Sequence, residues 1–94
     1  MGHCKPEELN DIEDILEEIR QFDGLKERKK GVFYYKSKGF LHFHSKAGER
    51  WADARCGVNW GDAIDLPFTA SPKQKKAFLK TIAYYYEELS LIHI

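Results

Sequence analysis

The stretch Phe40-Leu41-His42-Phe43-His44 decides the fold of this chain, because it is apolar and aromatic yet too short to form a helix of its own. Side chains alternate between the two faces of a β-strand, so Leu41 and Phe43 lie on one side and His42 and His44 on the other. The first side suits a hydrophobic core. The second side carries two imidazoles that a core does not require, and it is therefore the first place to look for a function.

Segments with strand character continue on both sides of this run. Residues 31–36 are rich in β-formers and predict a strand before it, and residues 50–58 and 63–68 predict two strands after it. Short glycine-containing turns separate the four segments. Residues 23–30 are charged and are interpreted as a connector. Strands joined by such short turns predict an antiparallel meander.

A helix is predicted at each end of the meander. Residues 6–22 place apolar side chains at helical spacing, with Pro6 in the first turn. A second helix begins at Ser71, where Pro72 at the first helical position and Gln74 three residues after the cap form a capping box. The predicted fold is α+β: a two-layer sandwich, in the order αββββα, within a single domain over residues 1–94. Both helices pack on one face of the four-stranded sheet and leave the other face open.

Pairing of the strands defines which residues share the open face. If His44 lies opposite Trp51, then His42 lies opposite Asp53 and Phe40 opposite Arg55. The next hairpin, with Cys56 opposite Ile64, brings Asp65 opposite Arg55. The candidate ligand or partner surface is then Phe33, Tyr35, Phe40, His42, His44, Trp51, Asp53 and Arg55. A slip of one residue exchanges the faces of a strand, so this surface depends on register.

The histidine pair is open to two chemical interpretations. His42 and His44, with Asp53 nearby, are ligand types of zinc and other divalent transition metals, but no further ligands with diagnostic spacing accompany them. His3 and Cys4 can join them only if the N-terminal segment folds over the sheet. Alternatively, Asp53 orients His42 for acid–base chemistry, although no nucleophile motif accompanies the pair, and a hydrogen bond that only stabilises the hairpin is the better explanation. No other cofactor motif is present.

Composition limits the other classes of function. The 94 residues carry 15 Lys and Arg against 15 Asp and Glu. A net charge of zero, together with Asp53 and Asp65 on the aromatic face, argues against nucleic-acid binding. Cys4 and Cys56 are too few for a disulfide framework, and no apolar run has the length of a membrane span. We therefore expect a cytoplasmic protein.

Exposed aromatic side chains next to an arginine are typical of interface centres. The sequence therefore favours a small binding or protein-interaction module that uses the face around His42 and His44, for a small ligand or for a second copy of the chain in a homodimer. A metal-binding or histidine-dependent enzyme site on the same face is the alternative.

The segment 33–44, followed by Ala52-Asp53-Ala54-Arg55, resembles a pattern in small uncharacterised bacterial proteins. Those proteins also carry an aromatic strand, a basic turn with serine, a Leu-His-Phe-His run and an Ala-Asp-x-Arg strand. The resemblance implies no reaction and no catalytic residue. It favours His42, His44, Asp53 and Arg55 as the site, because these residues belong to the shared pattern.

Overall fold

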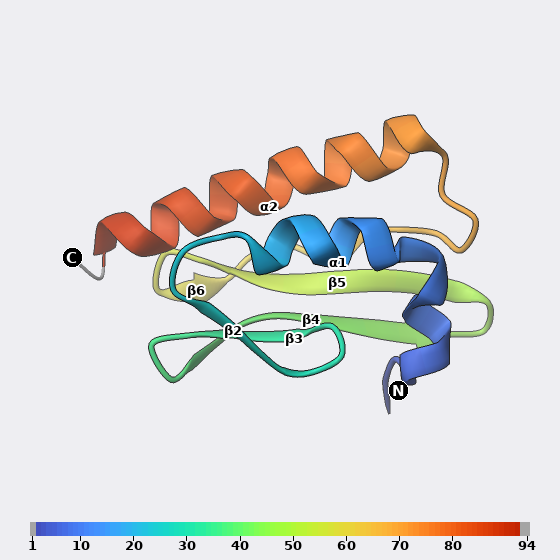
Figure 1. Cartoon of the computed structure of the whole chain (residues 1–94), viewed down its shortest axis with the longest axis horizontal. Helices are drawn as coiled ribbons and strands as arrows, with labels where there is room; N and C mark the ends of the chain where they lie inside the picture. Colours follow the sequence, from blue (N-terminus) through green and yellow to red (C-terminus); the bar gives the residue numbers. More distant parts are fainter. Residues whose placement is uncertain (1, 93–94) are drawn as a thin grey trace.

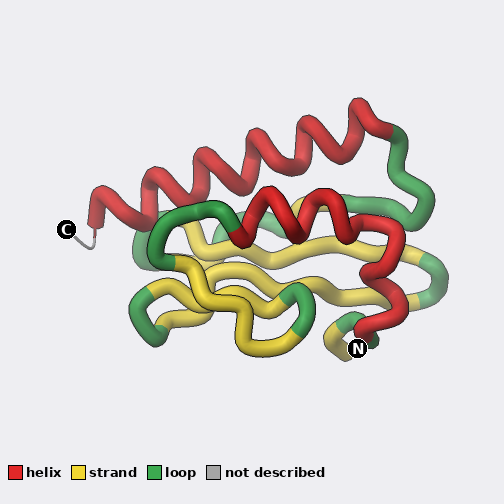
Figure 2. Tube along the Cα trace, in the orientation of Figure 1, coloured by secondary structure: helices red, strands yellow, loops and turns green. Residues whose placement is uncertain are grey.

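A computed structural model describes residues 2–92 and shows an antiparallel sheet with helices packed against it (Figures 1 and 2). The strands run in the order β2-β3-β4-β5-β6, while β1 pairs with β4 and β7 pairs with β5. Their bounds are β1 Gly2–His3, β2 Leu25–Lys29, β3 Val32–Tyr35, β4 Lys38–Lys46, β5 Glu49–Cys56, β6 Asn59–Trp60 and β7 Ile64–Asp65. The predicted α+β class is confirmed.

The helices begin and end close to the predicted positions. The first predicted helix is divided into a 3₁₀ segment, η1 (Pro6–Ile12), and an α-helix, α1 (Glu13–Arg20). The second, α2, spans Pro72–Ile92, and its capping box is confirmed by reciprocal hydrogen bonds between Ser71 and Gln74. Of the helices in residues 2–92, none combines the length and the apolarity that crossing a bilayer requires.

Both helices pack on the same side of the sheet and close one hydrophobic core. The helices contribute apolar side chains from their inward stripes, and β4 and β5 contribute the floor on which these stripes rest. The small side chains of Ala52 and Ala54, both 0% exposed, let the helices come close to the sheet. The fully or nearly fully buried members include Leu9, Ile12, Ile15, Leu16, Ile19, Leu41, Phe43, Phe78, Ile82 and Leu89.

The prediction of four strands is wrong. The charged segment interpreted as a connector forms β2, which pairs with β3 at the edge of the sheet. Its side chains alternate in exposure: Leu25 and Glu27 are half-buried, while Lys26 and Arg28 are exposed. Charged side chains on an edge strand discourage pairing with another sheet, and they hide the apolar alternation by which a strand is recognised.

A β-bulge in β4 changes which residues share a face with His42 and His44. Phe33 pairs with Leu41 but Tyr34 pairs with Gly39, so Phe40 is an extra residue in β4. Phe40 and Leu41 are therefore both 0% exposed and both face the helices. Phe33 and Tyr35 follow Phe40 into the core, and the prediction that these three aromatic residues share the face of the histidines is wrong. Tyr34, between Phe33 and Tyr35, lies on the histidine face.

The last strand is shorter than predicted and pairs in a different register. β7 covers two residues, and Ile64 lies opposite Ala52 rather than Cys56. Asp65 consequently lies opposite Trp51, and the partner of Arg55 is Trp60 of β6. The shift is an even number of residues, so Asp65 still belongs to the histidine side of the sheet.

One buried arginine joins the elements at the end of the sheet. The side chain of Arg50, on the helix side of β5, is 0% exposed. Its guanidinium donates to both carboxylate oxygens of Asp11 at 2.7 and 2.9 Å, to the Glu8 carbonyl at 2.7 Å, and to the Leu66 and Pro67 carbonyls at 2.8 and 2.9 Å. The same group lies 4.4 Å from the centre of the Phe68 ring. Arg50 thus ties η1 and the segment after β7 to β5.

Replacing Arg50 with alanine is expected to lower the free energy of unfolding by about 3 kcal/mol or more, because it leaves buried carbonyls and the Asp11 carboxylate without their donor. Lys46→Ala removes an exposed cation of the same sheet and should change stability by less than about 0.5 kcal/mol. Urea denaturation of both variants measures the difference. Equal stability of the two variants would contradict the role given to Arg50.

Candidate functional site

The N-terminal strand adds a third histidine to the predicted pair. β1 pairs with β4 so that His3 lies directly opposite His44. The Cys4 amide donates to the Phe43 carbonyl at 3.0 Å and continues this pairing. Residues that lie opposite each other in an antiparallel pair share a face, so the His3 ring is on the same side of the sheet as His42 and His44. The N-terminal segment thus packs along the sheet, which was the condition for His3 to join His42 and His44.

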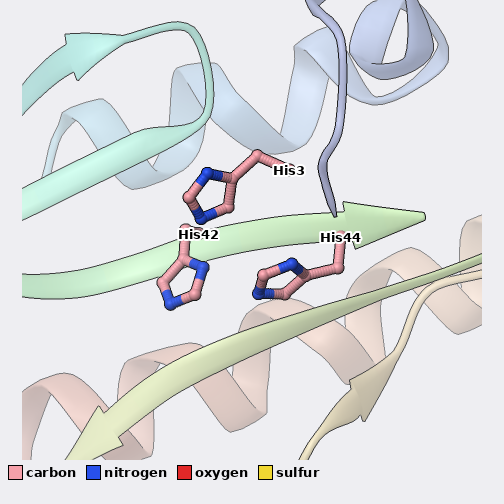
Figure 3. Close-up of side chains that lie close together, drawn as sticks. All are labelled: His3, His42 and His44. Atoms are coloured by element: carbon pink, nitrogen blue, oxygen red, sulfur yellow. The ribbon is translucent and has the colours of Figure 1, made fainter. Parts of the chain in front are cut away.

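The three imidazoles form one cluster (Figure 3). The ring centre of His42 lies 4.6 Å from that of His44 and 5.0 Å from that of His3, and the His3 and His44 rings stack at 4.9 Å. One ring nitrogen from each histidine lies within 4.8 Å of the other two. Three nitrogens of this kind, converging from two strands, are the donor set of a three-histidine metal site. We call His3, His42 and His44 the histidine cluster.

Asp53 fixes the orientation of one ring. The predicted pairing of His42 with Asp53 and of His44 with Trp51 is confirmed. The carboxylate, however, reaches diagonally to His44, whose Nε2 lies 3.0 Å from Asp53 Oδ2. The expectation that Asp53 orients His42 is therefore wrong. With Nε2–H donated to Asp53, the neutral His44 ring presents the lone pair of Nδ1.

Two ring nitrogens of the cluster lack a hydrogen-bond partner. Nδ1 of His42 and Nδ1 of His44 are both buried, and no polar atom of the described residues lies within hydrogen-bond distance of either. A buried polar group without a partner costs about 1–3 kcal/mol. The cluster therefore holds two buried ring nitrogens without partners at a cost in stability, and a bound cation would relieve this cost.

Two tryptophans shield the cluster. Trp60, in β6, folds back over the sheet so that its ring centre lies 4.9 Å from that of His42, and Trp51 stacks on His44 at 5.7 Å. The Arg55 guanidinium lies 4.6 Å from the centre of the Trp60 ring and donates to the Gly39 carbonyl at 2.8 Å, which holds the indole in place. His44 is consequently only 9% exposed, although none of the helices within residues 2–92 covers this face.

The structure thus divides the candidate residues between the two faces. Among the residues predicted as the surface, His42, His44, Trp51, Asp53 and Arg55 lie together. Cys4 does not join them, because its side chain packs against the core, where burial raises the pKa of the thiol. His3, which the sequence allowed only as a conditional ligand, completes the cluster, and Trp60, which shields it, was missed. The position of Trp60 in a short turn was the only signal in the sequence, since a turn offers a tryptophan little to pack against.

Comparisons with known proteins do not identify a family. No protein-family model, no curated protein and no solved structure matches this chain. The function must therefore be argued from the histidine cluster itself.

The cluster gives the apo-protein a pH dependence. Burial lowers the pKa of His42, and the positive charges of protonated His44 and His3 lower it further, against a smaller opposing effect of Asp53. The unfolded chain binds a proton near the usual value of 6.5, so between that value and the lower folded pKa it holds more protons than the native state. Stability should therefore be fully present above pH 6.5, decline as the pH falls below it, and level off below the folded pKa of His42.

Urea denaturation between about pH 8 and about pH 5 measures this decline, and His42→Gln should reduce it. Proton NMR of the His42 ring in the metal-free protein should give a titration midpoint below 6.5. A midpoint at or above that value would contradict the burial of the ring.

Proposed function

We propose that this protein binds a divalent transition-metal ion through His3, His42 and His44. The observation that carries the proposal is the convergence of three imidazole nitrogens within 4.8 Å, two of the rings having a buried Nδ1 without a hydrogen-bond partner. Imidazole nitrogen is a preferred ligand of zinc, copper and nickel. Neutral imidazole is the form that binds, and the lowered pKa of His42 favours this form near neutral pH.

The spacing of the rings fits a site that closes when the ion enters. Bonds of about 2.0–2.1 Å in a tetrahedral geometry need nitrogens about 3.4 Å apart, so nitrogens that lie within 4.8 Å of one another must approach by no more than about 1.4 Å. Rotation about the side-chain bonds supplies this movement. His3 is exposed and is the ring with the most freedom to move.

The contact of Asp53 with His44 supports the same assignment. A carboxylate on the far ring nitrogen of a metal-bound histidine fixes its tautomer and raises its basicity, and Asp53 has this relation to His44. Three protein ligands leave one tetrahedral position for water or a small ligand. The indoles of Trp51 and Trp60 would restrict access to that position and lower the local polarity.

The broader proposal is a binding module that uses the face of the histidine cluster. Trp60 is 44% exposed although it contacts His42, so part of the face is accessible to a ligand or a protein partner. A homodimer through this face remains one form of that proposal. Gel filtration with light scattering tests it: a strict monomer, with and without metal, would remove it.

Calorimetric titration of the protein with zinc, nickel and copper salts tests the metal site. We expect one ion per chain, and we expect His42→Ala or His44→Ala to weaken binding by at least about a hundredfold, because each removes a ligand. Asp53→Asn keeps the ligands and should weaken binding by about tenfold. Thermal unfolding of each variant establishes that it is folded.

Cys4→Ser is the matched control. It removes a metal-binding side chain next to His3 in the sequence, but one that packs against the core on the helix side of the sheet, and it should leave the affinity unchanged. Indifference of the parent protein to all three metals at micromolar concentration would overturn the proposal. Binding that survives His42→Ala but is lost in Cys4→Ser would overturn it as well.

A further inference from the structure

A second surface feature, which contains none of the three histidines, lies at the end of the sheet where β2 begins and β3 turns into β4. A hollow of about 250 Å³ is lined there by Gly24, Lys26, Arg28, Tyr34, Lys36 and Ser37. The turn between β3 and β4 lies at the end of the sheet that is far from the N-terminus (Figure 1). Lys26 lies opposite Tyr34 in the β2–β3 pair, so both side chains are on the face opposite the helices.

Charge is segregated across β2. Its one carboxylate, Glu27, points to the helix side, where the Arg20 guanidinium donates to it at 3.1 Å and the Gly31 amide at 2.8 Å. Lys26 and Arg28 alternate to the other side, and neither forms an ion pair within residues 2–92. Lys36, in the turn, also lines the hollow, but its ammonium lies over the Tyr35 ring, 5.5 Å from the ring centre. The positive charge is thus local, although the chain is neutral overall, and it is directed at one concave surface.

Aromatic rings continue from the hollow across the same face. The Arg28 guanidinium lies over the Tyr34 ring, 5.1 Å from its centre. Tyr34 pairs with Gly39, and a Cβ atom placed on Gly39 would lie 3.6 Å from the Trp60 ring. Gly39 of β4 therefore lies next to both Tyr34 of β3 and the edge of the Trp60 indole. Two ring systems, the half-buried Tyr34 and the exposed Trp60, thus each have an arginine against them.

We propose that this surface binds a nucleotide, with the phosphate between Lys26 and Arg28 and the base against Tyr34 and the edge of Trp60. Arginine and lysine hold phosphate oxygens by charge-assisted hydrogen bonds, and any base stacks on an aromatic ring. The hollow of about 250 Å³ takes only part of a nucleotide, so the base extends from it onto the open face. The ligand is either a free nucleotide or one residue of a single strand, and the experiment separates the two.

Fluorescence of Trp60 reports on this site directly. The chain has two tryptophans, so the Trp51→Phe variant leaves Trp60 as the only one. Titration of this variant in the presence of a chelator, with AMP and ATP in one arm and a short single-stranded oligonucleotide in the other, should quench the emission. Inorganic phosphate should bind more weakly than either. The tighter of the two nucleotide arms identifies the source, and salt should weaken both.

Substitutions in the same background test the contacts. Arg28→Ala and Tyr34→Leu should each lower the affinity by about tenfold, whereas Tyr34→Phe keeps the ring and should retain most of it. Lys46→Ala is the matched control, since Lys46 is an exposed cation at the far end of β4 and does not line the hollow. His3→Ala should leave the affinity unchanged, which separates this site from the metal site. Circular dichroism establishes that each variant is folded.

Three results would overturn the proposal. The first is the absence of binding in both nucleotide arms, by fluorescence and by calorimetry. The second is binding that Arg28→Ala and Tyr34→Leu leave unchanged. The third is binding of inorganic phosphate as tight as that of the nucleotides, which would remove the role of the aromatic rings.

Discussion

The buried guanidinium of Arg50 is the interaction on which the rest of the structure depends. The Arg50 side chain is fully buried, and it donates to carbonyls and a carboxylate of two separate segments, η1 and the residues after β7, which it holds against β5. Because its partners Glu8 and Asp11 belong to η1, Arg50 fixes the start of the chain against β5. β1 is connected to η1 by two residues, so the same contacts also place His3 on β4. A structural ion pair on one face thus positions a candidate ligand on the other.

The two faces of the sheet differ in the side chains that they carry. The helix side buries aliphatic and aromatic side chains and uses Arg50 to close the end of the core. On the opposite side, which the described helices leave uncovered, lie imidazole and indole rings with their polar partners. His42 and His44 lie between Trp51 and Trp60, and Asp53 accepts a hydrogen bond from His44. Such a surface is too polar to serve as core and too well shielded to be ordinary solvent-exposed sheet, and this combination is what supports a binding function.

Much of this arrangement follows from the sequence where a local rule determines it. The alternation in residues 40–44 and the short turn after Lys46 are enough to pair His42 with Asp53 and His44 with Trp51. The capping box at Ser71 and Gln74 fixes the start of α2 in the same way. These features are predictable because each depends on neighbouring residues and on geometry that any strand or helix shares.

The features that the sequence did not predict depend on contacts across the fold. The bulge at Phe40 is selected by the space beneath the helices, and it moves Phe33, Tyr35 and Phe40 into the core against the strict alternation. β2 is hidden by its charged side chains, and Arg50 appears in the sequence as one more basic residue at a strand end. His3 is 39 positions before His42, and only the pairing of β1 with β4 brings the two rings together. The proposed metal site has no spacing signature, because its ligands come from strands so distant in sequence.

The central claim is that β1 completes a three-histidine site, and the ring nitrogens themselves test it most directly. Long-range proton–nitrogen NMR spectra of the histidine rings can be recorded before and after a stoichiometric amount of Zn²⁺ is added. The account predicts that one ring nitrogen of His3, of His42 and of His44 shifts to the position of a metal-bound nitrogen. For His44 this nitrogen is Nδ1, and Nε2 keeps its proton and its bond to Asp53. Zinc that moves the signals of only one of these rings, or of none, would contradict the account.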